Sequence, residues 1–399
     1  MQRASQEIVV VGGGVMGAWA AARCAAKGTS VALVEQFNRG NSQGSSHGDG
    51  RIWRKAYDED LYVDMMELSL ELWGKLDGVM AETGMLAFAD SRSRDVLDRL
   101  CDLFRRRNVS HDLLDATAAR ARFPQFGGVP ECDAVFLEAA GVIYATRAVE
   151  ATWRLAEELG VKTFEGQRIR AVDGTTLTTP DYTFEASKAA IFAPGAWLSP
   201  LSKRLFNFEI PTRVTAECVS YHRPADASYS VANGMPVFTM RIDNGLGPFG
   251  YYGIPAIDIP GVKVSAHHCG PVLDSNQLSG AANLPDRDEN VLDANSRLVR
   301  TFWGPDRLDP TPFYTQRCLY TATPDHDYVL GRLPSNPKII LAGGGSGHAF
   351  KMGPAIGEAL ACLALNEPTP FDISQFKPDR PALVNARGHF PVPQPAYCK

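Results

Sequence analysis

The chain has 399 residues, of which 45% are hydrophobic, and its formal net charge is −5 with a pI near 5.9. This length predicts two domains, and the slight excess of acidic residues argues against a nucleic-acid-binding surface. No apolar run approaches the length of a membrane span, so we expect a soluble, intracellular protein without nucleic-acid or membrane partners.

The N-terminal region contains the pattern of a dinucleotide site. Residues 8–11 form a short β-branched run, and Gly12-x-Gly14-x-x-Gly17 follows and opens a helix-forming segment. Gly12 would permit a tight turn, Gly14 the approach of a pyrophosphate, and Gly17 the packing of helix on strand. A second predicted strand ends at Glu35, whose carboxylate suits a ribose diol. The pattern indicates a dinucleotide without specifying which one.

The next stretch, residues 39–54, holds too many small and polar residues for a helix or a core strand. We expect a long loop here, either functional or a solvated connector. Beyond it, apolar spacing predicts a helix over 61–76, a strand over 85–88 and a second amphipathic helix over 96–104.

The remaining elements predict one domain threaded through another. A helix ending near residue 159, strands at 161–164 and 188–193, and a strand, glycine turn and helix over 338–365 continue the first domain. Between residues 212 and 320, period-two segments interrupted by one helix at 289–302 predict a mainly antiparallel sheet. The predicted fold class is α/β with α+β: a discontinuous Rossmann-like nucleotide-binding domain with an inserted, mainly antiparallel substrate domain. The predicted boundaries are 1–85, 143–211 and 325–385 for the first domain, 86–142 and 212–324 for the second, and 386–399 for a C-terminal tail.

Six stretches, in order along the chain, carry a resemblance to a known family. They are residues 44–57, 141–145, 252–255, 260–268, 318–325 and 345–351. In these stretches the chain resembles the monomeric sarcosine oxidase family of flavoproteins, and within it the peroxisomal sarcosine/pipecolate oxidases.

The resemblance implies FAD as the cofactor and a secondary amino acid, such as sarcosine or L-pipecolate, as the substrate. Hydride would leave the carbon next to nitrogen, the imine would be hydrolysed, and O2 would reoxidise the flavin to give hydrogen peroxide. The resemblance also implies a monomer without a metal, in the cytoplasm or in peroxisomes, although residues 395–399 are not an obvious peroxisomal signal.

Site residues follow from the resemblance position by position. Cys318 matches the cysteine that bonds to the 8-methyl carbon of the flavin, and Arg54 and Lys351 match the two cations that hold the substrate carboxylate. A buried cation pair is costly unless an anion joins it, which gives both residues a physical reason to be there. The other residues expected to contact the cofactor are Gly12, Gly14, Met16, Gly17, Glu35, Ser45, Ser46, Gly345 and Gly347.

A second group matches residues around the reacting atoms. His47 and Arg51 match residues against the flavin ring, Tyr252 and His267 match side chains over the substrate, and Lys263 matches the lysine that promotes reaction with O2. If this segment is a strand, alternation places Lys263, Ser265 and His267 on one face. The neighbouring His268 would then point the other way and serve a structural role.

Two positions depart from the family, and two other functions stay open. Gly50 stands where a threonine or serine is usual, so a hydroxyl is missing and local packing can differ. Residues 239–249 align poorly, and Arg241 would either be exposed, which we favour, or contact a larger or doubly anionic substrate. The alternatives are a dehydrogenase that passes electrons to another carrier and a flavin-binding protein without turnover. Retention of the cationic pocket argues against the latter.

Overall fold

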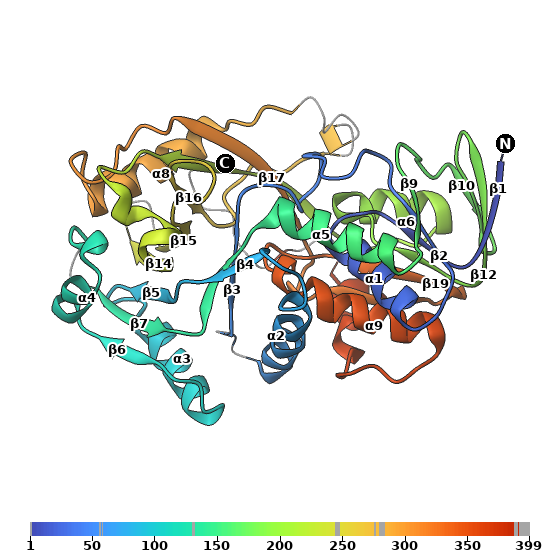
Figure 1. Ribbon diagram of the computed structural model, residues 1–399, viewed down its shortest axis with the longest axis horizontal. Helices are drawn as coiled ribbons and strands as arrows, with labels where there is room; N and C mark the ends of the chain where they lie inside the picture. Colours follow the sequence, from blue (N-terminus) through green and yellow to red (C-terminus); the bar gives the residue numbers. More distant parts are fainter. Residues whose placement is uncertain are drawn as a thin grey trace.

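The computed structural model describes residues 2–55, 57, 59–129, 132–243, 248–274, 277–278, 284–386 and 390. Two groups of elements lie side by side along the long axis of the molecule (Figure 1). One group contains the N-terminal strand and its parallel neighbours, and the other contains the long antiparallel sheet. Between them stands a small three-stranded sheet.

The first sheet has the central order β9-β2-β1-β12, with β19 and β11 both pairing with β12. The long strand β12 pairs in parallel with β1 along its length; on the other side its last residues pair with β19 and its earlier ones with β11. The strands are β1 (Gln2–Val11), β2 (Val31–Val34), β9 (Lys162–Phe164), β10 (Ala171–Asp173), β11 (Thr176–Thr178), β12 (Tyr182–Phe192), β18 (Val329–Leu333) and β19 (Asn336–Gly343).

Helices made of small residues pack against this sheet. α1 (Val15–Ala26) packs on α9 (Gly353–Leu365) and on α5 (Ala145–Glu158). A Cβ at Gly357 would lie 2.6 Å from the Cβ of Trp19, so this glycine lets α9 approach α1 closely. The edge of Trp19 meets the ring of Trp73 on α2 (Asp60–Trp73) at a centroid distance of 5.2 Å.

The second sheet runs β17-β13-β16-β15-β14-β5-β7-β6, with only the β14–β5 pair parallel among the described strands. Its strands are β5 (Met85–Ala89), β6 (Asp112–Leu114), β7 (Asp133–Leu137), β13 (Arg213–His222), β14 (Val237–Asp243), β15 (Pro248–Ile254), β16 (Val262–Ala266) and β17 (Tyr314–Ala322). Three helices pack on its strands: α3 (Arg94–Arg106), α4 (Ala116–Arg122) and α8 (Glu289–Phe302). Of the remaining helices, α6 (Leu198–Phe206) follows β12, and α10 (Pro381–Val384) lies near the end of the described chain.

The small sheet corrects one expectation. Residues 51–54, predicted to be the end of a loop, form β3 (Arg51–Arg54), which pairs with β8 (Ala140–Ile143); β4 (Met80–Glu82) pairs with the other edge of β8. A strand is hard to predict from these four residues, because only Trp53 is buried and both arginines line a cavity. The predicted fold class is confirmed, and helix α8 has the predicted bounds. The predicted domain boundaries stay a prediction, since strand pairing alone does not define them.

Among the described residues, none of the helices is both long and apolar enough to cross a membrane. That part of the chain also contains no group of three or more His, Cys, Asp or Glu side chains placed to hold a metal ion.

Candidate active site

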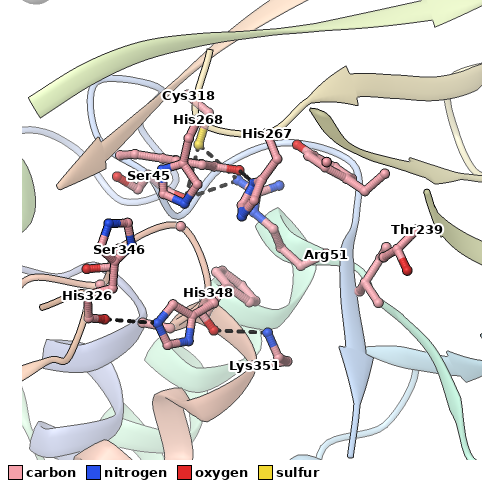
Figure 2. A pocket seen from close by; sticks show the side chains of 18 of the residues that line it. Ser45, Arg51, Thr239, His267, His268, Cys318, His326, Ser346, His348 and Lys351 are labelled. Atoms are coloured by element: carbon pink, nitrogen blue, oxygen red, sulfur yellow. Dashed lines mark hydrogen bonds between the residues drawn. The ribbon is translucent and has the colours of Figure 1, made fainter. Parts of the chain in front are cut away.

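A cavity of about 1070 Å³ opens where the two large sheets and the small sheet meet. Figure 2 shows its wall, with Cys318, Arg51 and His267 together and the His348–Lys351 segment across from them. The structure brings most of the predicted site residues to this wall. Those lining it are Gly14, Met16, Ser45, Ser46, Arg51, Arg54, Tyr252, Lys263, His267, Cys318, Gly345, Gly347 and Lys351.

A second cavity of about 280 Å³ is lined by Gly12 and Glu35 and shares Gly14, Ser45 and Ser46 with the first. The Gly13 N–H donates to the Glu35 carboxylate at 2.6 Å, and burial raises the pKa of Glu35 above its ordinary value. Because they share these lining residues, the two cavities lie next to each other. The smaller one has the Glu35 carboxylate in its wall, and the larger one has a thiol and cations.

The glycine turn beneath this space leaves no room for side chains. Gly12 has φ +99°, and a Cβ at Gly17 would lie only 1.9 Å from the carbonyl oxygen of Gly12. Of the predicted site residues, Gly17 and His47 line neither cavity, and Gly50 does not line them either. Gly17 packs against the carbonyl group of Gly12 in the turn. His47 and Gly50 contribute through their carbonyl oxygens, which accept hydrogen bonds from Arg51 and Lys263.

Arg51 connects the loop of residues 45–50 to the second sheet. Its guanidinium donates to the carbonyl oxygens of Gly50 at 2.9 Å and His47 at 2.7 Å, and it lies 3.6 Å from Cys318 Sγ. The His47 imidazole is buried, and burial followed by the charge of Arg51 lowers its pKa to about 3. His47 is therefore neutral, and its carbonyl group helps to orient Arg51.

Lys263 reaches the cavity from β16 with 3% of its surface exposed, and its Nζ donates to the carbonyl oxygen of Gly50 at 3.1 Å. Burial, followed by repulsion from Arg51, lowers its pKa from the ordinary 10.5 to about 7. A Cβ at Gly50 would lie 3.0 Å from side-chain atoms of both Ile257 and Val142. These apolar side chains take the space into which a side chain at position 50 would extend.

Two cations lie against the ring of Tyr57. The Arg54 guanidinium lies 5.5 Å and the Lys351 ammonium 5.2 Å from the ring centroid. Lys351 is 7% exposed and donates to the carbonyl oxygen of His348 at 3.0 Å. Burial, followed by the charge of Arg54, holds the pKa of Lys351 well below its ordinary value. An anion bound between the two cations would raise the pKa of Lys351 again, because a nearby negative charge favours the ammonium form.

His348 anchors this corner, and sequence reasoning did not single it out. Its Nε2 lies 3.2 Å from the carbonyl oxygen of His326, so the hydrogen-bond pattern assigns the ring proton to Nε2. Nδ1 then accepts from the Tyr328 hydroxyl at 2.9 Å, and burial lowers the pKa of His348 to about 3. The only available signal was its position within the Gly345–Lys351 motif.

His267 shares a hydrogen bond of 3.1 Å with the Tyr320 hydroxyl, and its ring meets that of Tyr252 edge-on at 6.0 Å. Lys263 and His267 both line the cavity, but Ser265, expected on the same face, does not: its hydroxyl donates to the carbonyl oxygens of Cys218 and Ala266. The expectation for His268 is wrong, because it also lines the cavity, with its ring centroid 4.2 Å from that of His267. The strand ends at Ala266 and His268 takes φ +61°, so alternation no longer applies.

Arg241 is exposed, as favoured, and also lies in the wall of the cavity. Of the poorly aligned segment that contains it, residues 244–247 fall outside the described residues.

Known proteins with a similar sequence identify the family of this chain. A family model described as FAD dependent oxidoreductase matches residues 7–363. The chain belongs to this family. This FAD-dependent oxidoreductase is 31% identical to the peroxisomal sarcosine oxidase of Homo sapiens, over 95% of this chain and 97% of that protein. It is 29% identical to the monomeric sarcosine oxidase of Bacillus sp. (strain B-0618), over 94% and 96% of the two chains.

A solved structure shares the fold. NikD, described as an unusual amino acid oxidase essential for nikkomycin biosynthesis, superposes with a TM-score of 0.78 at 24% identity, over 94% of this chain and 97% of that one.

The residues present fit FAD, the cofactor of the family. Glu35 and the glycine turn line the smaller cavity. The Glu35 carboxylate suits a ribose, and the backbone N–H groups at the N-terminus of the helix favour a pyrophosphate. The wider cavity, with Cys318 and Arg51 in its wall, has room for the redox-active ring system and for a small substrate.

Proposed function

We propose that this enzyme is a monomeric FAD-dependent oxidase of secondary amino acids, such as sarcosine, L-pipecolate or a related N-alkyl or cyclic amino acid. The observation that carries the proposal is a pair of cations, the half-buried Arg54 and the buried Lys351, on one wall of the cavity that also contains His267 and Lys263. A protein that only binds FAD needs the glycine turn and Glu35, and has no use for two cations in a substrate-sized space. The names of the relatives, which are sarcosine oxidases, agree with this substrate class.

Each side chain then has a defined task. Arg54 and Lys351 hold the carboxylate of the substrate, because charge-assisted hydrogen bonds to an anion offset the cost of placing the buried Lys351 ammonium beside the half-buried Arg54 guanidinium. Burial, followed by the charges of neighbours led by His268, keeps the pKa of His267 well below its ordinary value, so its imidazole is neutral and can orient the substrate amine through a hydrogen bond. Burial raises the pKa of Tyr252 to about 12, so its hydroxyl keeps its proton and can donate a hydrogen bond. Bound in this cavity, FAD would supply the acceptor for a hydride from the carbon next to nitrogen and the means of returning the electrons to O2.

A peroxide assay on the purified yellow protein tests this proposal. The panel pairs N-methyl and cyclic amino acids with the amines that lack their carboxylate. We expect hydrogen peroxide in step with consumption of the secondary amino acids and little turnover of the matched amines. Substrate-dependent bleaching of the flavin without peroxide would instead favour the dehydrogenase, and no bleaching with any amino acid would favour a binding protein.

We further propose that Cys318 forms a thioether with the 8-methyl carbon of the flavin. Cys318 lies in the wall of the large cavity, and the Arg51 guanidinium donates to its Sγ at 3.6 Å, which supports this assignment. The bond would replace the S–H and one methyl C–H, and the two protons and two electrons released would pass to O2, giving hydrogen peroxide.

For Cys318→Ala, we expect acid precipitation to leave the yellow colour in the supernatant. The wild-type protein should keep the colour in the pellet, with the corresponding gain in mass. Cys362→Ala, which removes a buried thiol on α9 outside both cavities, serves as the control and should behave like the wild type. Free flavin in the wild-type supernatant would refute the bond.

A further inference from the structure

A buried carboxylate without a role in the proposed reaction lies beside the cavity. Glu217, in the interior of β13, is 1% exposed. Its Oε2 accepts from the N–H groups of Cys269 and Gly270, both at 3.0 Å, and its Oε1 accepts from the Thr215 hydroxyl. Burial raises the pKa of Glu217 to about 7. Burying a carboxylate in a sheet interior costs free energy unless hydrogen bonds compensate for the lost contact with water.

The segment that Glu217 holds is a bulge. Along β13, Ser220 is five positions from Thr215, whereas their partners Val264 and Val272 on the other chain segment are eight positions apart. The regular strand β16 ends at Ala266, and the extra residues follow it. Bulges of this kind redirect side chains next to active sites.

Backbone contacts fix where the bulge begins and ends. The N–H of His267 donates to the carbonyl oxygen of Gly250 at 2.8 Å, and the N–H of Ala216 to that of Pro271 at 2.9 Å. A Cβ at Gly270 would lie 2.3 Å from the carbonyl oxygen of Ala216, so the end of the bulge lies directly on β13. Between these points, the carboxylate of Glu217 accepts from the backbone N–H groups of Cys269 and Gly270.

We propose that Glu217 is a positioning residue for the oxidation, which holds the bulge of residues 267–271 so that the His267 imidazole stands over the substrate. The proposal rests on the role of His267 in the proposed function. The same strand also supports the partner of His267, because Thr215 pairs with Tyr320 and Glu217 pairs with Cys318 across β13 and β17. The hydrogen bond between Tyr320 and His267 therefore has both of its residues positioned by β13: Tyr320 through the pairing with Thr215, and His267 through the bulge that Glu217 holds.

Two substitutions separate this role from a general contribution to stability. Glu217→Gln keeps an acceptor for the two N–H groups and a polar partner for Thr215, whereas Glu217→Leu leaves both N–H groups buried without an acceptor. In stopped-flow experiments with the holoenzyme, we expect Glu217→Leu to slow flavin reduction by a secondary amino acid about tenfold to a hundredfold. Reoxidation by O2 should stay near the wild-type rate, since Lys263 lies on β16 before the bulge. Glu217→Gln should reduce within about threefold of the wild type.

Amide hydrogen exchange measures, independently of activity, how well the hydrogen bonds to Glu217 protect the N–H groups of the bulge. In Glu217→Leu we expect faster exchange of the Cys269 and Gly270 amides, with β15 and β17 unchanged. Thr215→Val, which removes one donor to the carboxylate, should show a smaller shift of the same kind and gives the test if Glu217→Leu does not fold.

Equal slowing of both half-reactions, or unchanged exchange with unchanged reduction, would overturn the proposal. If the wild type oxidises no amino acid, the proposed function fails, and the exchange of these two amides still decides whether Glu217 holds the bulge.

Discussion

Lys263→Met is expected to slow reoxidation of the reduced enzyme by O2 about 10²- to 10³-fold, while reduction by substrate changes little. Electron transfer to O2 creates negative charge on oxygen in a water-poor cavity, and a fixed ammonium stabilises that charge as it develops. Lys263 is suited to this task because its Nζ is buried and held by a neutral carbonyl group, that of Gly50. Stopped-flow measurement of the two half-reactions separates this role from binding of the carboxylate, which is assigned to other cations.

The pH dependence gives a second check on the same residue. Because the pKa of Lys263 is about 7, the ammonium form dominates below that pH and is lost as the pH rises through it. The reoxidation rate should therefore fall with rising pH in the wild type and lose this dependence in Lys263→Met. Wild-type rates in the variant would show that the lysine is not the oxygen site, and sluggish reaction of the wild type with O2 would then favour a dehydrogenase.

Lys351→Met should weaken substrate binding roughly tenfold to a few hundredfold, because each charge-assisted hydrogen bond contributes on the order of 1.5–3 kcal/mol. Arg54→Lys should be similarly damaging, since an ammonium does not reproduce the planar bidentate fork of a guanidinium. The measurement is the dissociation constant of a substrate or of a simple carboxylate, followed by the flavin spectrum.

Lys55→Met provides the matched control for this pair. Lys55 is next in sequence to Arg54, but its ammonium pairs with Glu67 at 3.2 Å on the surface, where ion pairs contribute little. This variant should bind like the wild type. Equal turnover of an amino acid and its decarboxylated amine by the wild type would count against a carboxylate site at Arg54 and Lys351.

Patterns that depend on neighbouring residues allowed the sequence to predict much of this molecule. The glycine turn after β1, Glu35 at the end of the second strand and helix α8 all follow from local spacing, which sterics and periodicity determine. The predicted site residues that line the large cavity were found through the resemblance, because their convergence depends on strands far apart in the chain.

The features that were missed depend on contacts that no local pattern encodes. Glu217 looks like an ordinary polar position in β13 until its carboxylate meets the N–H groups of Cys269 and Gly270. His268 was assigned to the wrong side because alternation assumes a regular strand, and a bulge begins just before it. His348 acquires its role only from Tyr328 and His326, which lie on the other side of the glycine-rich turn.

The pairing of β1 with β12 also bears on how the chain folds during synthesis. The first strand ends at Val11, but β12 begins about 170 residues later, and β19 follows only after the whole second sheet. At about 5–20 residues per second, the open edge of β1 waits roughly 10 to 30 s for its neighbour to leave the ribosome. During that interval the run Ile8-Val9-Val10-Val11 is an apolar strand with one side unpaired, prone to pair with other chains. The N-terminal segment is therefore where a nascent chain of this protein most needs a chaperone.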